Sequence, residues 1–364
     1  MKKLLRIVLA LMLSLSIFCS YVMAADSVSF VGKESNKLDS YDFPVKGGTY
    51  EWESFTSHRE MTEACQIPQD TLKNMSTAGL VESVLNYPLY GDMLAYSNLQ
   101  DGVEALSNQF NGLAELLTRD DAGKELLSVY KNNINVLEVK SLSTSLQKGN
   151  YALKLAYLET ILSQDKILSS LTQAEKEDLE KESIKKDTEK KSQNDVFKFT
   201  LDTSDTINKT ISIMASIGYV YTPNGTPVEV IVDRTEMSSS EMVAADTYVA
   251  VYYPGAVKLA SATNKYNCHS YAWYSRSTSN IRWMNDPSAY MTDGSYTYLG
   301  TTPPSVIVSY PRMYYPGEHS AWMTSSTGST YSKITCTSKW GSLPLMSHKA
   351  NYCPYNYSII EFYN

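Results

Sequence analysis

Hydrophobic residues in the first half of the chain, from about residue 60 to residue 195, recur at steps of three and four positions. That spacing is typical of amphipathic α-helices. Stripes of this kind run through three segments, residues 80–85, 103–117 and 152–162. Together they predict an all-α N-terminal module over residues 50–170.

Polar residues indicate where these helices begin and end. Ser76 or Thr77 is placed to cap the first helix, since a side-chain oxygen there can accept a hydrogen bond from a free backbone N–H. Short polar segments at 119–121 and 148–150 are expected to separate successive helices.

A strongly charged segment follows the helical module. Thr172 and Glu175 form a capping box, and 13 of the 17 residues that start at Glu175 are charged. Leu179 and Ile184 are its apolar residues, so we predict a solvated helical linker over residues 171–196. The alternative, a coiled coil that binds a partner, would need a regular series of apolar positions that this segment lacks.

After Phe197 the pattern changes towards alternation of apolar and polar residues, which is typical of β-strands. Asn224-Gly225 lies between two such runs and is a strong signal for a β-hairpin. The segment 267–275 lacks Gly and Pro and is the best helix candidate in this half. These elements predict an α+β domain over residues 210–364. Its strands are predicted over residues 217–221, 228–232, 247–253, 305–310, 321–324 and 332–337.

The first 25 residues have the pattern of a secretory signal peptide. Basic residues precede an apolar run from Ile7 to Phe18, and a small-residue cleavage site ends at Ala24. The apolar run is about half as long as a membrane span, and no second run of spanning length follows it. We therefore expect a secreted protein without membrane contact after cleavage.

Charge and composition narrow the choice of partner. The signal segment holds three of the 32 Lys and Arg residues and none of the 39 Asp and Glu residues, so the rest of the chain has a net charge near −10. This balance argues against nucleic acid, because phosphate binding needs basic patches. The 28 tyrosines, concentrated in the second half, fit β-structure and a polar binding groove.

One cysteine, Cys268, stands at the start of the predicted helix 267–275. A free thiol, with a pKa of ~8.5, is mostly protonated at neutral pH, but a helix N-terminus and a nearby imidazole both favour the thiolate. His319 lies 51 positions later, after the turn residues 316–318 and at the start of a predicted strand. If the fold brings them together, Cys268 can attack an amide carbonyl while His319 shuttles the proton, without a cofactor.

A third catalytic residue, which would hold the imidazole of His319 in place, is left open by the sequence. Ser338, in the strand after His319, ranks slightly ahead of His348. His269 directly follows the cysteine, but adjacent residues do not share a helix face, so we interpret it as a structural or groove residue.

Two metal-site alternatives use other residues. Cys336, His348 and Cys353, with or without Cys268, are zinc ligand types, but their spacing matches no paired Cys-x-x-Cys or His-x-x-x-His arrangement. The segment 285–294 contains Asp and Gly as calcium loops do, yet it lacks alternating oxygen ligands. We therefore expect no metal. A disulfide between Cys336 and Cys353 can form in an oxidising compartment.

Five short motifs carry a resemblance to known proteins. The first reads Tyr-Asn-Cys-His-Ser-Tyr-Ala-Trp, and the five lie at residues 266–273, 283–291, 319–321, 337–341 and 353–355. With them the chain resembles the secreted papain-like hydrolases of the NlpC and CHAP type, and more specifically an uncharacterised group of exported Gram-positive proteins. The resemblance covers residues 217–364. It implies a papain-like (NlpC/CHAP-type) fold for the C-terminal domain, with Cys268 and His319 as the catalytic pair.

We thus expect a secreted cysteine peptidase or amidase, a thiol protease in the broad sense, that hydrolyses an amide in peptidoglycan peptide or another peptide. The alternative is a non-catalytic extracellular binding domain that keeps the papain-like fold and uses its Tyr- and Trp-rich groove for recognition. Thiol reactivity distinguishes the two, since a nucleophilic cysteine is expected to have a lowered pKa.

Overall fold

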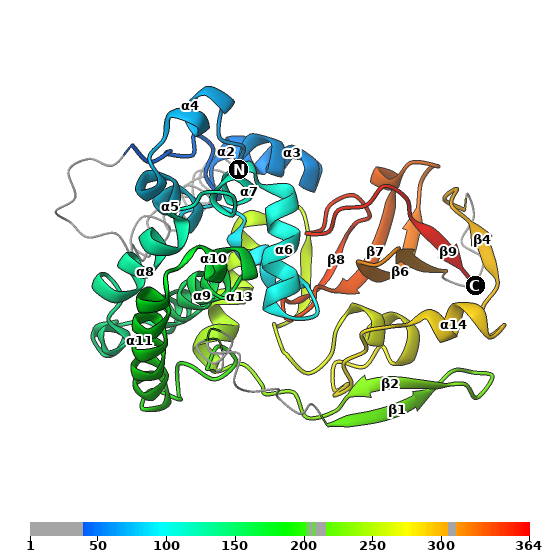
Figure 1. Cartoon of the computed structure of the whole chain (residues 1–364). Helices are drawn as coiled ribbons and strands as arrows, with labels where there is room; N and C mark the ends of the chain where they lie inside the picture. The colour runs from blue at the N-terminus through cyan, green and yellow to red at the C-terminus, as the bar shows by residue number, and fades with distance from the viewer. Residues whose placement is uncertain (1–38, 202, 204–206, 208–215, 305–310) are drawn as a thin grey trace, which may run out of the picture.

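The computed structural model describes residues 39–201, 203, 207, 216–304 and 311–364. An N-terminal helical region is followed by a region built on an antiparallel sheet, so the α+β class is confirmed (Figure 1). The predicted signal segment 1–25 and the predicted strand 305–310 lie outside the described residues. No helix in the described part of the chain is long and apolar enough to cross a membrane.

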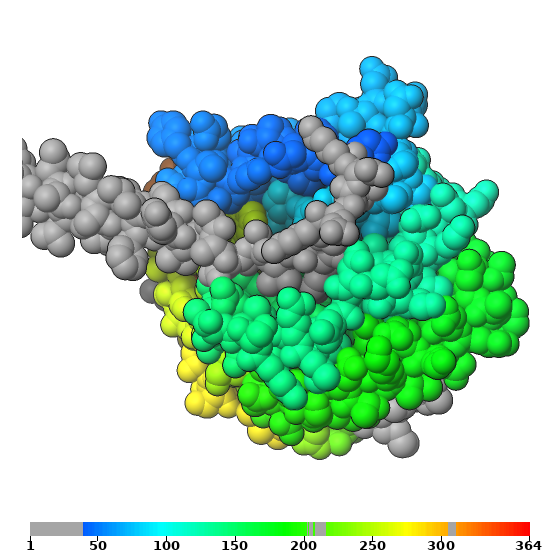
Figure 2. Space-filling view, turned by 90° about the vertical axis from the view of Figure 1, so that its left-hand side faces the viewer, coloured from blue at the N-terminus to red at the C-terminus, as the bar shows by residue number. Residues whose placement is uncertain are grey.

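Helices occupy most of the chain from residue 50 to residue 191, and they form the face that Figure 2 turns to the viewer. Ser76 accepts a hydrogen bond from the Gly79 N–H at the start of α5 (Thr77–Leu85), so it caps this helix as predicted. The other elements are α2 (Tyr50–Glu53), α3 (His58–Ala64), α4 (Gln69–Asn74), η1 (Tyr90–Ala95), α6 (Leu99–Gln109), α7 (Asn111–Leu116), α8 (Ala122–Asn132), η2 (Val136–Ser141), α9 (Ser145–Leu162), α10 (Asp165–Ser170) and α11 (Gln173–Lys191).

Two helix boundaries differ from the prediction. The stripe over residues 103–117 is divided at Phe110, which separates α6 from α7. The predicted break at 148–150 lies inside α9, where helix α13 (Ser239–Tyr252) packs against it. A Cβ on Gly149 would stand 2.0 Å from the Ser240 carbonyl oxygen. This glycine therefore permits two helices to approach closely, and the prediction of a helix break here is wrong.

The charged helix α11 is buried along one side, which corrects the prediction of a solvated helix. The buried stripe consists of Leu179, Ser183, Lys186 and Lys190. Lys186 Nζ donates to the Ile134 carbonyl at 2.7 Å, and Lys190 Nζ pairs with the buried carboxylate of Glu159. Ile184, by contrast, is 54 % exposed. Lys186 also pairs with Glu182 on the same helix, but the contacts with Ile134 and Glu159 that bury this side lie far away in the sequence, and counting charges could not reveal them.

Antiparallel strands form the core of the C-terminal region. They are β1 (Ile217–Tyr221), β2 (Pro227–Ile231), β3 (Val257–Ala260), β4 (Tyr298–Gly300), β5 (Arg312–Tyr315), β6 (His319–Ser326), β7 (Ile334–Lys339), β8 (Leu345–Lys349) and β9 (Glu361–Tyr363). β1 and β2 form a separate hairpin around Asn224-Gly225, as predicted. The other strands pair in the order β3-β8-β7-β6-β5-β9-β4. The predicted strand 321–324 lies within β6, and the prediction at 332–337 overlaps β7.

The predicted strand at 247–253 is wrong, because most of this segment belongs to α13. Ser238 and Glu241 form a capping box at the start of that helix. Tyr248 and Val249 favour strands by propensity, but here they are buried in the helical packing. Three short elements complete the region: the π-helical turn η3 (Ser270–Tyr274), α14 (Ser288–Thr292) and η4 (Tyr331–Lys333).

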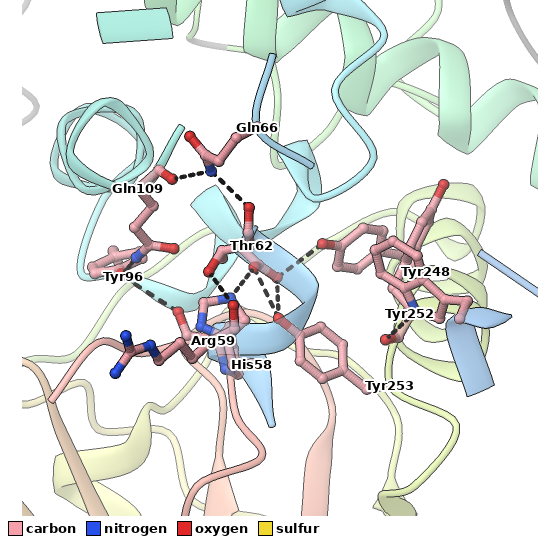
Figure 3. Close-up of polar contacts among 12 residues, drawn as sticks. His58, Arg59, Thr62, Gln66, Tyr96, Gln109, Tyr248, Tyr252 and Tyr253 are labelled. Carbon is pink, nitrogen blue, oxygen red and sulfur yellow. Dashed lines mark hydrogen bonds and ion pairs between the residues drawn. The ribbon is translucent and has the colours of Figure 1, made fainter. Parts of the chain in front are cut away.

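The helical and sheet regions share one continuous hydrophobic core. Where they meet, the buried carboxylate of Asp92 accepts hydrogen bonds from His58 Nε2 at 3.0 Å and from the hydroxyls of Tyr248 and Tyr253 at 2.8 Å. Figure 3 labels the three donor residues. Three donors satisfy this carboxylate and fix α3, η1 and α13 relative to one another. The division into a helical module over residues 50–170, a linker over 171–196 and a separate domain over 210–364 stays a prediction.

Candidate active site

The cysteine singled out from the sequence begins a helical segment, as predicted. Cys268 and His269 are helical and continue into η3. Asn267 caps the segment, since its Oδ1 accepts the Ser270 N–H at 3.1 Å. The Asn267 Nδ2 donates to the Met284 carbonyl at 2.6 Å, which ties the cap to a neighbouring loop. The Cys268 side chain is therefore held at the N-terminus of a short, capped helix.

The thiol of Cys268 does not have the lowered pKa that the sequence analysis expected. Burial raises its pKa to about 11, although the backbone N–H groups of Ser320 and His269 and the ammonium of Lys339 act in the opposite direction. The residue is 3 % exposed, so the cost of placing a charge away from water exceeds the help from the amides. At neutral pH the resting thiol is protonated.

His319 is the first residue of β6 and pairs with Tyr315 across the β5–β6 hairpin. The turn at residues 316–318 delivers it there, with Gly317 at φ 77°. Its ring is fully buried and stacks on Tyr355 with ring centroids 3.9 Å apart. Burial, with His348 and His269 nearby, holds the pKa of His319 well below its usual range, so the imidazole is neutral.

The helix that begins with Cys268 lies beside the start of β6, but the thiol and the imidazole of His319 are not hydrogen bonded to each other. The backbone N–H of Ser320, the residue after His319, acts to lower the pKa of the thiol. Neither ring nitrogen of His319 has a hydrogen-bond partner among the described residues. Two unpartnered nitrogens in a buried ring are uncommon, because each costs the free energy of its lost hydrogen bond to water.

His269 lies beside the thiol and has a defined orientation. Its Nδ1 is 2.8 Å from Ser320 Oγ, and that hydroxyl oxygen accepts a hydrogen bond from Trp273 Nε1 at 2.8 Å. Burial lowers the pKa of His269 to about 4. His269 lines the same cavity as Cys268.

The two candidates for the third catalytic position bind each other. Ser338 Oγ is 2.7 Å from His348 Nε2 and accepts a hydrogen bond from Trp340 Nε1 at 3.0 Å. His348 Nδ1 is 2.8 Å from the Lys349 carbonyl, so Nδ1 carries the proton and Nε2 is the acceptor. Neither side chain is hydrogen bonded to His319, and the assignment of an orienting residue stays a prediction.

The cysteines and the aspartate considered above as metal ligands are not grouped around a common centre in the described part of the chain. The described residues contain no cluster of three or more His, Cys, Asp or Glu side chains that could hold a metal ion. Cys65, Cys268, Cys336 and Cys353 are buried free thiols. Asp293 accepts hydrogen bonds from the Thr222 hydroxyl and the Ser295 N–H, as in a turn.

A cavity of about 280 Å³ opens in front of Cys268, between the sheet region and the helical region. Its sheet-side wall includes Asn267, Cys268, His269, Trp283, Asn285 and Glu318. The opposite wall consists of Ala95, Tyr96, Ser97, Asp101, Glu104, Ala105 and Asn108, from η1, α6 and the loop that joins them. The cavity therefore needs both regions, and it presents three carboxylates.

The helical wall was missed from the sequence. It is fixed by long-range contacts: Ser342 N–H donates to the Leu94 carbonyl at 2.8 Å, and the Tyr355 hydroxyl donates to the Ala95 carbonyl at 2.8 Å. Gly341 has φ 51°, and a Cβ on it would lie 2.4 Å from the Ala95 backbone. The sequence shows that α6 has a polar face, but it does not indicate that this face lies across the cavity from Cys268.

The chain matches no family model, no curated protein and no solved structure.

Proposed function

We propose that this protein is a secreted cysteine peptidase or amidase that hydrolyses an amide bond in cell-wall peptide or another peptide. One observation carries the proposal: Cys268 starts a capped helix on the wall of the cavity, where the backbone N–H groups of Ser320 and His269 act to lower the pKa of its thiol. This combination of a nucleophile, amide donors and space for a substrate is what thiol-dependent acyl transfer requires.

The proposed reaction begins with a peptide carbonyl in the cavity. Cys268 Sγ attacks the carbonyl carbon, and its proton passes to the neutral imidazole of His319, which later donates it to the leaving amine. Water then hydrolyses the thioester. Because the resting thiol has a pKa of about 11, proton removal should accompany attack and not precede it. His319 is not hydrogen bonded to the thiol at rest, so substrate binding must bring the two side chains into contact.

The order of elements supports a papain-like fold for the C-terminal region. A helix that begins with the cysteine follows β3 and precedes the other strands of the antiparallel sheet, and one of these strands, β6, begins with the histidine. The resemblance of residues 217–364 to NlpC and CHAP hydrolases points to the same arrangement. Export follows from the signal-like segment 1–25, and mass spectrometry of culture-medium protein should find a mature start at Ala25 or Asp26.

A second candidate function is a non-catalytic binding domain on the same fold. The raised pKa of the Cys268 thiol and the absence of a hydrogen bond from His319 to any described residue favour it. In that case the cavity, with Trp283 and Tyr96 in its walls, would hold a peptide without cleaving it. The two functions differ in whether a product forms.

The experiment is to incubate the mature protein with peptidoglycan fragments and with a generic peptide library, and to analyse products by mass spectrometry. Cys268→Ala should remove all cleavage. Cys353→Ser is the matched control, because Cys353 is also a buried free thiol but does not line the cavity. Binding of fragments without cleavage by the wild-type protein would favour the binding-domain function.

A further inference from the structure

The ring of His269 is anchored by one nitrogen and leaves the other without a partner. Its Nδ1 is 2.8 Å from Ser320 Oγ, and the same hydroxyl oxygen is 2.8 Å from Trp273 Nε1. Ser320 is fully buried, and Trp273 is nearly so. His269 Nε2 forms no hydrogen bond to any residue in the described part of the chain.

This buried chain of hydrogen bonds determines which ring nitrogen carries a proton. An indole N–H can only donate, so Ser320 Oγ accepts a hydrogen bond from Trp273. The hydroxyl proton of Ser320 needs an acceptor of its own, because the side chain is buried, and His269 Nδ1 is the acceptor to which it is bonded. Nδ1 is therefore the unprotonated nitrogen, and Nε2 carries the proton of the neutral ring.

The opposite tautomer would leave a buried donor unsatisfied. With the proton on Nδ1, Ser320 Oγ would accept two hydrogen bonds, and its own O–H would face no acceptor among the described residues. A charged ring would still present a proton on Nε2, because both nitrogens then carry hydrogen. The Nε2–H donor is therefore present whatever the charge of the ring.

The free N–H is available to the cavity in front of Cys268. His269 lines that cavity with only 5 % of its surface exposed. The fully enclosed unpartnered atoms of the described residues include both ring nitrogens of His319, but His269 Nε2 is not one of them. The carboxylate of Asp286, which acts on the ring, instead accepts hydrogen bonds from the Ser288 N–H and hydroxyl at 2.8 Å. A donor without an acceptor thus lies on the wall that holds the thiol.

We propose that His269 Nε2–H donates a hydrogen bond to the carbonyl oxygen of a peptide bound in front of Cys268. When Cys268 Sγ bonds to the carbonyl carbon, the π electron pair of the C=O bond moves to the oxygen and the thiol proton passes to His319. The Nε2–H then donates to that oxyanion, a role that a neutral imidazole can have. The catalytic step rests on the proposed function, whereas the hydrogen bond to a bound carbonyl is equally expected of a binding domain.

The tautomer is tested first, without any ligand. In protein labelled with ¹⁵N-histidine, long-range ¹H–¹⁵N spectra distinguish protonated from unprotonated ring nitrogens, and the His269 signals are identified by their loss in His269→Gln. We expect a protonated Nε2 and an unprotonated Nδ1. His348 is the internal control, because its Nδ1 lies 2.8 Å from the Lys349 carbonyl and it should show the opposite tautomer. A proton on Nδ1 alone of His269 would overturn the proposal.

Contact with a ligand is tested in Cys268→Ala, which cannot cleave. Binding of peptidoglycan fragments should shift the His269 Nε2–H signal, and a bound fragment that leaves this signal unchanged would overturn the proposal. Adding His269→Phe should weaken binding by about threefold to tenfold, the effect of one hydrogen bond. His269→Gln, whose amide N–H can replace the donor, should recover most of the affinity. The tautomer and the shift are measured with His269 in place, so they decide the question even if His269→Phe does not fold.

Kinetics separate this proposal from the proposed function. If the wild-type protein cleaves a peptide, His269→Phe should lower kcat by about 100- to 1,000-fold with KM within a few-fold, as for the loss of one oxyanion donor. His348→Phe is the matched control, and circular dichroism gives the folded fraction of each variant. Wild-type kcat in folded His269→Phe would overturn the proposal and leave the proposed function intact. Fragments that shift the Nε2–H signal but are never cleaved would do the reverse, and fragments that are neither bound nor cleaved would overturn both.

Discussion

Two cysteine–histidine pairs in the C-terminal region differ in almost every respect. Cys336 and His348 are directly opposite each other on β7 and β8, with Cys336 Sγ 3.5 Å from His348 Nε2. Ser338 and Trp340 complete the hydrogen bonds of this cluster. Both side chains of the pair are buried, and neither lines the cavity in front of Cys268. Cys336 and His348 therefore have the contact that a catalytic pair needs, but a substrate in this cavity cannot reach them.

Cys268 and His319 show the opposite arrangement. The thiol lines the cavity, but the imidazole has no hydrogen-bond partner among the described residues. Buried polar groups are normally satisfied, and the exceptions are concentrated at functional sites. A structural pair, in which the polar atoms bind each other, therefore differs from a candidate catalytic pair, in which the thiol lines the cavity and the histidine nitrogens have no partner among the described residues.

The largest difference is expected from replacing each histidine. His319→Ala should lower kcat by about 100- to 10,000-fold, the usual contribution of a general base. His348→Ala should leave kcat within a few-fold of the wild-type value once it is corrected for the folded fraction, because both ring nitrogens of His348 are occupied by Ser338 and the Lys349 carbonyl. Steady-state kinetics on a cleaved peptide, with the folded fraction from circular dichroism, checks both. Equal losses of kcat from the two substitutions would contradict the assignment of His319 as catalytic and His348 as structural.

The next prediction concerns acid stability, to which both pairs contribute. Burial lowers the pKa of His269 and His348 to about 4 and that of His319 well below its usual range. In the unfolded chain these rings take up protons near pH 6.5, so the histidine contribution to stability is fully present above that pH and is lost as the pH falls towards 4. Each ring adds a slope of about 1.4 kcal/mol per pH unit in this range. Urea unfolding between pH 4 and pH 7 measures it.

His348→Gln should flatten that pH dependence by one ring's share, and His319→Gln should do the same. A stability that is constant from pH 7 to pH 4.5 would contradict the description of these histidines as buried and neutral.

A smaller effect is expected at Ser338. Ser338→Ala removes the nearer of two acceptors of the Trp340 indole N–H and a partner of His348, and it should lower the free energy of unfolding by about 1–3 kcal/mol. Denaturant unfolding measures this loss. If kcat of the folded variant also falls by tenfold or more, Ser338 acts in catalysis as well, and the cluster around Cys336 is not purely structural.

Local signals in the sequence predicted their elements well. Asn224-Gly225 gave the hairpin, Ser76 the cap of α5, and the run after Asn267 the helix that begins with Cys268. Each signal depends on hydrogen bonds within a few residues, so the sequence contains all of it.

Features set by distant partners were missed or misread. Tyr248 and Val249 have high strand propensity, but they lie in α13, which packs on α9. Lys186 was predicted to be exposed to solvent, but its ammonium donates a hydrogen bond to the Ile134 carbonyl. Contacts between distant parts of the chain also place α6 in the wall of the cavity and bury Cys268, which raises the pKa of its thiol. Which surfaces meet is decided by tertiary structure, and neither propensity nor spacing encodes it directly.

The most direct test of the central claim is to alkylate the wild-type protein with iodoacetamide at pH 8 while cleavage is followed in the same samples. Peptide mapping reports the modification of Cys65, Cys268, Cys336 and Cys353. Cys268 should be modified first, cleavage should fall in proportion to that modification alone, and Cys336 should stay unmodified until the protein unfolds. Full cleavage by protein whose Cys268 is completely alkylated would contradict the assignment of this thiol as the nucleophile.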